Sequence, residues 1–94
     1  MNMKYKLWDC CLKVGKYQNG NTRLELTDAD SGEPIAVATV NFDERLPSNE
    51  AFIKDYSENT GMVAFLQEHK IISTNKLCSV RTGYVTVDKY KLLV

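Results

Sequence analysis

The first residues of the chain alternate between apolar and polar side chains, as a β-strand does. This period of two runs over residues 4–17 and predicts one strand there. We expect Trp8 and Leu12 to face the core, and Tyr5 and Leu7 to lie on the opposite face, which is then partly covered. The apolar residues of the first face are Trp8, Cys10, Leu12 and Val14.

A hairpin signal follows at Asn19-Gly20, which separates this strand from a second alternating run over Thr22–Thr27. Asn-Gly favours a type I′ turn, because both central residues of that turn need positive φ. Leu24 and Leu26 share one face of the return strand and are expected in the core.

A turn and a third strand complete a predicted three-strand meander. The segment Asp28–Pro34 has acidic residues two apart, as a calcium loop does, but Thr39 stands where the bidentate Glu would be. We therefore interpret it as a plain turn. Both faces of Ile35–Phe42 carry apolar residues, which predicts a central strand with Val37 or Val40 in the core.

One amphipathic helix is predicted from about Thr60 to His69. Its apolar residues recur at i, i+3, i+4 and i+7, which places Phe65 and Leu66 in the core. The competent N-caps before it are Ser57, Asn59 and Thr60.

Strand-like residues lie on both sides of this helix. The sequence leaves open whether 51–53 is a helical turn or extended. Residues 77–82 and 84–93 predict one or two further strands, with a bulge or bend at Gly83. The expected fold class is α+β: a mostly antiparallel sheet of four or five strands with one main helix packed on one face.

Composition narrows the class of protein. The chain has 94 residues, which fits a single domain over 1–94, and its twelve basic and twelve acidic residues cancel. This balance does not indicate nucleic acid or membrane binding by charge alone. No apolar run reaches the length of a membrane span, so we expect a cytoplasmic protein without a membrane partner. Its three cysteines, Cys10, Cys11 and Cys78, are expected to be reduced thiols.

Candidate catalytic chemistry is sparse. His69 is the single histidine, and its place at a helix end on the apolar side is typical of a core or rim residue. The cysteines and His69 lack the paired spacing of a zinc site, and the glycines are scattered rather than gathered in a phosphate loop. We predict a protein that is not an enzyme and has no cofactor and no metal.

Several segments together resemble a family of small uncharacterised proteins carried by conjugative elements, plasmids and prophages of Gram-positive gut bacteria and their relatives. The resemblance covers the chain from about Gly20 to Leu92 and implies a cytoplasmic accessory protein of a mobile genetic element. It implies no activity and no functional residues. The segments are Val40-Asn41, Ala51–Asn59, Gly61-Met62 with Phe65-Leu66, and Arg81–Val85.

Two functions follow as hypotheses. The first is a non-catalytic protein-binding module, an adaptor or inhibitor of a host or defence protein, whose identity the sequence does not indicate. Its contact site is expected at Asp55, Tyr56, Glu58 and Asn59, on a polar loop before a helix N-terminus that can hold an anion. The alternative is a weak nucleic-acid-binding accessory factor using Arg81, Tyr84, Lys89 and Lys91. The same C-terminal residues also suit an edge strand protected by lysines, which we favour.

Overall fold

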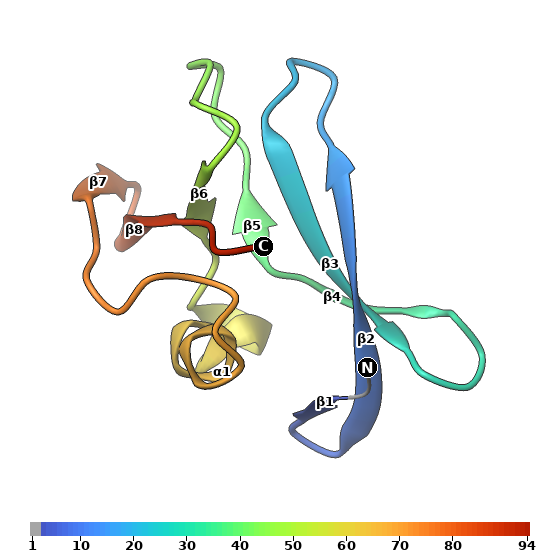
Figure 1. The fold of residues 1–94 in the computed structure, drawn as a ribbon. Coiled ribbons are helices and arrows are strands. Elements are labelled where there is room, and N and C mark those ends of the chain that lie inside the picture. The colour runs from blue at the N-terminus through green and yellow to red at the C-terminus, as the bar shows by residue number, and fades with distance from the viewer. Residues whose placement is uncertain (1–2) are drawn as a thin grey trace.

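The computed structural model describes residues 3–94, which form two antiparallel four-stranded sheets and one short α-helix (Figure 1). The strand order is β1-β2-β3-β4 in the first sheet and β5-β6-β8-β7 in the second. The prediction of mostly antiparallel strands with a helix is confirmed, but the prediction of one sheet is wrong. The elements are β1 (Met3–Tyr5), β2 (Trp8–Lys16), β3 (Thr22–Asp28), β4 (Pro34–Val37), β5 (Thr39–Val40), β6 (Glu50–Ile53), the 3-10 turn η1 (Ser57–Asn59), α1 (Met62–Glu68), β7 (Cys78–Thr82) and β8 (Val85–Lys91).

The chain passes from one sheet to the other at Ala38. The Ala38 amide donates to the Leu24 carbonyl of β3 at 2.8 Å, and the Ala38 carbonyl accepts from the Lys54 amide at 2.8 Å. In place of one strand over 35–42, the chain forms two short edge strands, β4 and β5, so the predicted central strand is wrong. Both faces of this segment are apolar because it serves two sheets. Val37 and Val40 are only partly buried, whereas Ala38 is buried.

The predicted N-terminal strand is broken into a hairpin at Lys6-Leu7. Lys6 has φ +54°, and β1 folds back on β2 so that Tyr5 pairs with Trp8. Tyr5 then reaches the core, where its ring lies 5.1 Å from the Phe65 ring, edge to face. Trp8 is 46% exposed, so its predicted core position is wrong. Alternation alone does not reveal this fold-back, because it continues across the turn.

The hairpin predicted at Asn19-Gly20 is confirmed as β2–β3, and β4 completes the predicted meander. Its turn is not type I′. Gly20 has φ +90°, but Asn19 is not among the described residues with positive φ. The Gly20 amide donates to the Tyr17 carbonyl at 2.9 Å and the Tyr17 amide to the Asn21 carbonyl at 2.8 Å. This pattern is typical of a three-residue loop closed by a glycine bulge.

The segment between β3 and β4 is a turn, as predicted. The Asp28 carboxylate accepts hydrogen bonds from the backbone amides of Ser31 at 3.0 Å and Asp30 at 2.8 Å. These amides, that of Ser31 first, hold the pKa of Asp28 below its usual value. The Asp28 carboxylate therefore fixes the turn through backbone amides.

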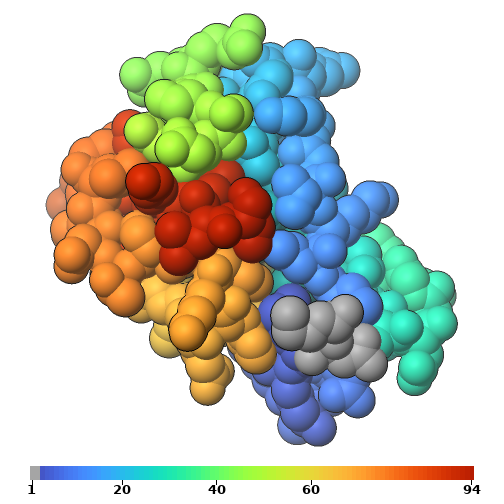
Figure 2. Space-filling model, in the orientation of Figure 1, coloured from blue at the N-terminus to red at the C-terminus, as the bar shows by residue number. Residues whose placement is uncertain are grey.

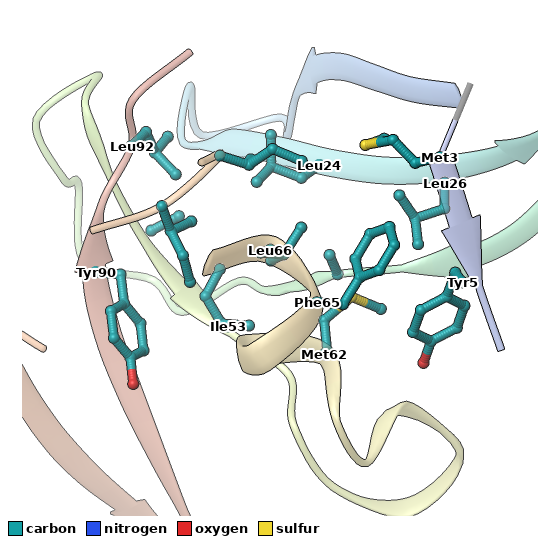
Figure 3. Close-up of a cluster of buried hydrophobic side chains, with 14 of the residues drawn as sticks. Met3, Tyr5, Leu24, Leu26, Ile53, Met62, Phe65, Leu66, Tyr90 and Leu92 are labelled. Atoms are coloured by element: carbon teal, nitrogen blue, oxygen red, sulfur yellow. The ribbon is translucent and has the colours of Figure 1, made fainter. Parts of the chain in front are cut away.

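The core lies between the two sheets, and α1 places its apolar side chains in this space (Figure 3). The predicted core residues Leu24, Leu26, Phe65 and Leu66 are buried there, and Leu12 packs against them while partly exposed. The core also contains residues outside the predicted core set: Met3, Tyr5, Cys10, Ala38, Ala51, Ile53, Met62, Ile71, Ile72, Tyr90 and Leu92.

The C-terminal strands β7 and β8 form a second hairpin around Gly83-Tyr84. Gly83 has φ +59° and Thr82 pairs with Val85, as in a two-residue turn with glycine at its first central position. The undecided segment at 51–53 is extended and forms most of β6, which pairs with β8.

Candidate functional site

The loop before α1 begins with Asp55, which caps the helix. One carboxylate oxygen of Asp55 accepts from the Gly61 amide at 2.7 Å, and the other from the Val63 amide at 3.0 Å. Gly61 is the N-cap residue with φ +96°, and its cap position has no side-chain hydrogen bond of its own, so Ser57, Asn59 and Thr60 are not the N-caps. The first amides of the helix are thus bonded to the chain's own carboxylate.

Asn59 anchors the other end of the loop. Its side chain is 2% exposed, and Nδ2 donates to the Val37 carbonyl of β4 at 2.7 Å. Thr60 Oγ1 donates to the Ser57 carbonyl at 2.9 Å and closes η1. Asp55 and Asn59, both predicted contact residues, therefore anchor the loop to the start of α1 and to β4.

Tyr56, Ser57 and Glu58 form the outward part of this loop. Lys54 Nζ lies 2.9 Å from Glu58 Oε2 and 5.6 Å from the centroid of the Tyr56 ring. The hydrogen bond from Lys54 is the main reason why the pKa of Glu58 lies below its usual value. Lys6 Nζ also donates to the Glu58 carbonyl at 2.8 Å. Tyr56 is partly exposed, and Ser57 and Glu58 are exposed.

Ser57 has a backbone conformation that side-chain-bearing residues adopt infrequently. Its φ is +55°, in the left-handed region. Such conformations persist where the surrounding structure determines them, and the bonds at Asp55 and Asn59 do so here. The loop is thus held in one shape.

A groove of about 360 Å³ runs beside this loop. It is lined by β4 and Thr39 of β5, and by Lys54, Glu58 and Asn59 of the loop region. The sequence did not indicate this groove, because it depends on β4 lying at the edge of the first sheet next to the loop. We call the outward residues Tyr56, Ser57 and Glu58, together with this groove, the loop site.

The residues of the alternative nucleic-acid face do not lie together. Strand pairing places Lys89 opposite Cys78 and Arg81 opposite Thr86, so Arg81 is on the other face of the sheet from Lys89 and Lys91. Tyr84 is fully exposed at the hairpin tip.

Lys89 is half-buried on the outer face of this sheet. Its Nζ lies 3.0 Å from Glu50 Oε1 and 5.9 Å from the centroid of the Phe52 ring. The hydrogen bond to Glu50 is the main reason why the pKa of Lys89 is raised. This ammonium group is thus already paired with a carboxylate.

The predicted protection of an edge by these lysines is wrong. Lys89 and Lys91 lie on β8, which is between β6 and β7 in the second sheet. The edge strand is β7, which contains Arg81 and no lysine. Strand order decides this, and the sequence does not give strand order.

The remaining chemical candidates lie apart. The His69 ring packs 4.7 Å from the Phe65 ring, and its Nε2 lies 4.0 Å from a carboxylate oxygen of Glu68. Cys10 is buried, which raises the pKa of its thiol, whereas Cys78 is exposed. Within residues 3–94, no three His, Cys, Asp or Glu side chains are placed to hold a metal ion.

Comparison with known proteins adds no relative. No protein-family model matches the chain, and no curated protein and no solved structure matches it. The resemblance to a mobile-element family therefore stays a prediction. No helix in the described part of the chain is long and apolar enough to cross a membrane.

Proposed function

We propose that this chain is a non-catalytic protein-binding module of a mobile genetic element, an adaptor or inhibitor of a host or defence protein, and that it binds its partner at the loop site. The observation that carries the proposal is the anchoring of this loop. Asp55 and Asn59 fix it by hydrogen bonds of 2.7 Å to Gly61 and Val37, while Tyr56 and Glu58 remain accessible.

Such anchoring favours binding for a thermodynamic reason. A loop that is ordered before it meets its partner loses less conformational entropy on association. A partly exposed tyrosine adds a large contact that is partly polar, at low entropy cost. The groove beside Glu58 offers room for a side chain or a short segment of the partner.

Affinity capture from a Gram-positive host lysate tests the proposal. The bait is the parent chain, Tyr56→Ala combined with Glu58→Lys, or Tyr84→Ala as a matched control that removes an exposed tyrosine elsewhere. We expect one captured protein to be retained by the parent and by Tyr84→Ala, and to be lost with the loop variant. Equal thermal melting curves must accompany this loss, since otherwise Tyr56 is a packing residue.

Two results contradict the proposal. The first is capture of the same protein by the loop variant and by the parent. The second is capture that disappears after nuclease treatment, falls steeply with salt and is abolished by Lys89→Glu with Lys91→Glu. That result would support the nucleic-acid alternative, because phosphate contacts release counterions.

A further inference from the structure

The two sheets have four edges in all, and three of them are short or obstructed. Strand β1 has three residues and β5 has two. Strand β4 begins with a proline, its pairing with β3 is irregular, and the Val37 carbonyl accepts the Asn59 side chain. These are the ways in which proteins prevent an edge from pairing with another chain.

Strand β7 has none of these protections. It has five residues in unbroken register with β8, it contains no proline or lysine, and each of its side chains is exposed. Figure 1 shows it at the outer limit of the second sheet. An exposed, regular edge strand is a template for another strand.

The hairpin fixes which backbone groups of β7 point outward. The pair next to a two-residue turn, Thr82 and Val85, exchanges backbone hydrogen bonds, and such pairs then alternate along the strand. The Lys89 carbonyl of β8 accordingly points toward the chain of β7, where it accepts a hydrogen bond from the Leu77 amide at 2.7 Å. The N–H and C=O groups of Ser79 and Arg81 therefore face away from β8.

We infer that two copies of this chain associate through β7, antiparallel and about a two-fold axis at Val80. In this register Ser79 of one copy lies opposite Arg81 of the other, so the outward backbone groups of both residues are paired. The inference concerns a different surface from the loop site and does not depend on the proposed function.

Charge complementarity on one face of the sheet supports this register. Within one copy Ser79 lies beside Asp88, whose carboxylate bonds the Ser79 hydroxyl, and Lys76 Nζ is 3.9 Å from the same carboxylate oxygen. Arg81 of the second copy lies one strand beyond Ser79, about 10 Å from Asp88 at the usual strand spacing. An extended arginine spans much of this distance across a small serine and approaches the carboxylate.

Apolar side chains on the other face favour the same axis. Val80 is 38% exposed and pairs with Val87, which is 1% exposed. The axis at Val80 places the two Val80 side chains against each other and continues the valine row across both copies. An axis at Arg81 would instead place two guanidinium groups opposite each other, which is unfavourable.

The association closes at two copies. Each copy contributes its β7 edge once, so the interface is isologous. The joined sheet ends at both sides in the two-residue strand β5, which offers little to a third copy. A contact of one strand is small, so we expect a weak dimer that forms with rising concentration.

Sedimentation over a concentration series, from about 5 μM to about 500 μM, tests the dimer by mass action. We expect Arg81→Glu to weaken it at least tenfold, since it places a carboxylate toward Asp88. Asp88→Arg should weaken it similarly, and the double variant should restore it. Lys91→Glu is the matched control, because Lys91 is exposed on the interior strand β8, and should leave the dimer unchanged.

Cross-linking tests the register separately. Cys78 lies opposite Thr82 of the second copy in a pair whose Cα atoms are about 4.5 Å apart, a distance that allows a disulfide. Thr82→Cys oxidised with diamide should give a covalent dimer, and adding Cys78→Ser should prevent it. A protein that is monomeric at every concentration, an association unaffected by Arg81→Glu, or a cross-link independent of Cys78 would each overturn the inference.

Discussion

At its tip the β2–β3 hairpin is covered by the segment between β5 and β6, whereas the β7–β8 hairpin ends in a fully exposed tyrosine. Figure 2 shows residues in the 41–50 range lying against the first tip. Asn21 is 4% exposed there, and its side chain bonds the Glu44 carbonyl at 2.8 Å and the Leu46 amide at 2.8 Å. The second tip carries Tyr84, which is 100% exposed.

This difference shows that a hairpin's role depends on what its turn residues contact. In the first hairpin, side-chain amides satisfy backbone groups of an irregular segment, and Asn19 adds a bond of 2.9 Å to the Phe42 carbonyl. The first hairpin thereby holds the segment between β5 and β6 in place. The second hairpin is anchored along β8 and leaves the β7 edge available for binding.

The largest expected effect is on the core side of the first hairpin. Leu24 is completely buried on β3, so Leu24→Ala should lower the free energy of unfolding by about 2–5 kcal/mol. Val80→Ala, on exposed β7, should cost well under ~1 kcal/mol. Urea denaturation at low protein concentration measures both. Equal costs would contradict the proposed difference between the hairpins.

Asn21→Ala should have the next largest effect. It removes two part-buried hydrogen bonds, to the Glu44 carbonyl and from the Leu46 amide, at a cost of about 2 kcal/mol. Hydrogen exchange should rise in residues 41–46 before it rises in β2 and β3. Asn75→Ala is the matched control on an exposed residue and should change neither measurement. An equal increase in hydrogen exchange throughout the chain would show that Asn21 does not organise residues 41–46 locally.

Gly20→Ala should cost about 1 kcal/mol or more, because Gly20 has φ +90° and L-residues are strained in this region. The added Cβ would also lie 3.3 Å from the Arg45 guanidinium, although this exposed side chain can move. Gly20→Asn should cost less, since asparagine tolerates positive φ better. Thermal melting compares the two variants, and a neutral Gly20→Ala would refute the assigned turn.

The turn between β3 and β4 should respond to acid. Because the pKa of Asp28 is lowered in the folded protein, its contribution to stability is complete above its unfolded pKa near 3.8. It is lost as the pH falls through the folded-state pKa, below 3.8. The Ser31 amide shift in an NMR titration should follow this proton, and Asp28→Asn should abolish the response while keeping an acceptor oxygen. A midpoint above 3.8 would contradict the hydrogen bonds.

Local signals in the sequence predicted much of the fold. The Asn-Gly pair marked the β2–β3 hairpin, and helical spacing placed Phe65 and Leu66 in the core. Ala38 shows where local signals fail. An apolar run on both faces of a strand has the same appearance in a central strand as in a segment that joins two sheets, and only long-range pairing distinguishes them.

The candidate site residues show the same difference between what local sequence signals predict and what only the complete fold determines. Polar loop composition singled out residues 55–60 as a candidate contact site, but it gave no way to separate Tyr56 and Glu58, which are accessible, from Asp55 and Asn59, which anchor the loop. Lys89 and Lys91 suggested an edge strand, yet β8 is interior. Whether a strand lies at an edge depends on strand order, and whether a residue anchors a loop depends on its burial. Both are set by the complete fold and not by local sequence.

The last prediction concerns thiol labelling, which compares the accessibility of the two hairpins directly and perturbs stability least. Cys10 lies completely buried on β2 with a raised thiol pKa, whereas Cys78 is exposed on β7. In a Cys11→Ser background, the Cys78 thiol should react with a disulfide reagent as fast as a peptide thiol. The Cys10 thiol should react at least about a thousandfold more slowly, because its labelling requires opening of the core. Cys78→Ser should remove the fast phase alone, and two fast thiols would show that the first hairpin is not held closed. If β7 pairs between copies, the fast phase should also slow as the protein concentration rises, while the slow phase should not change.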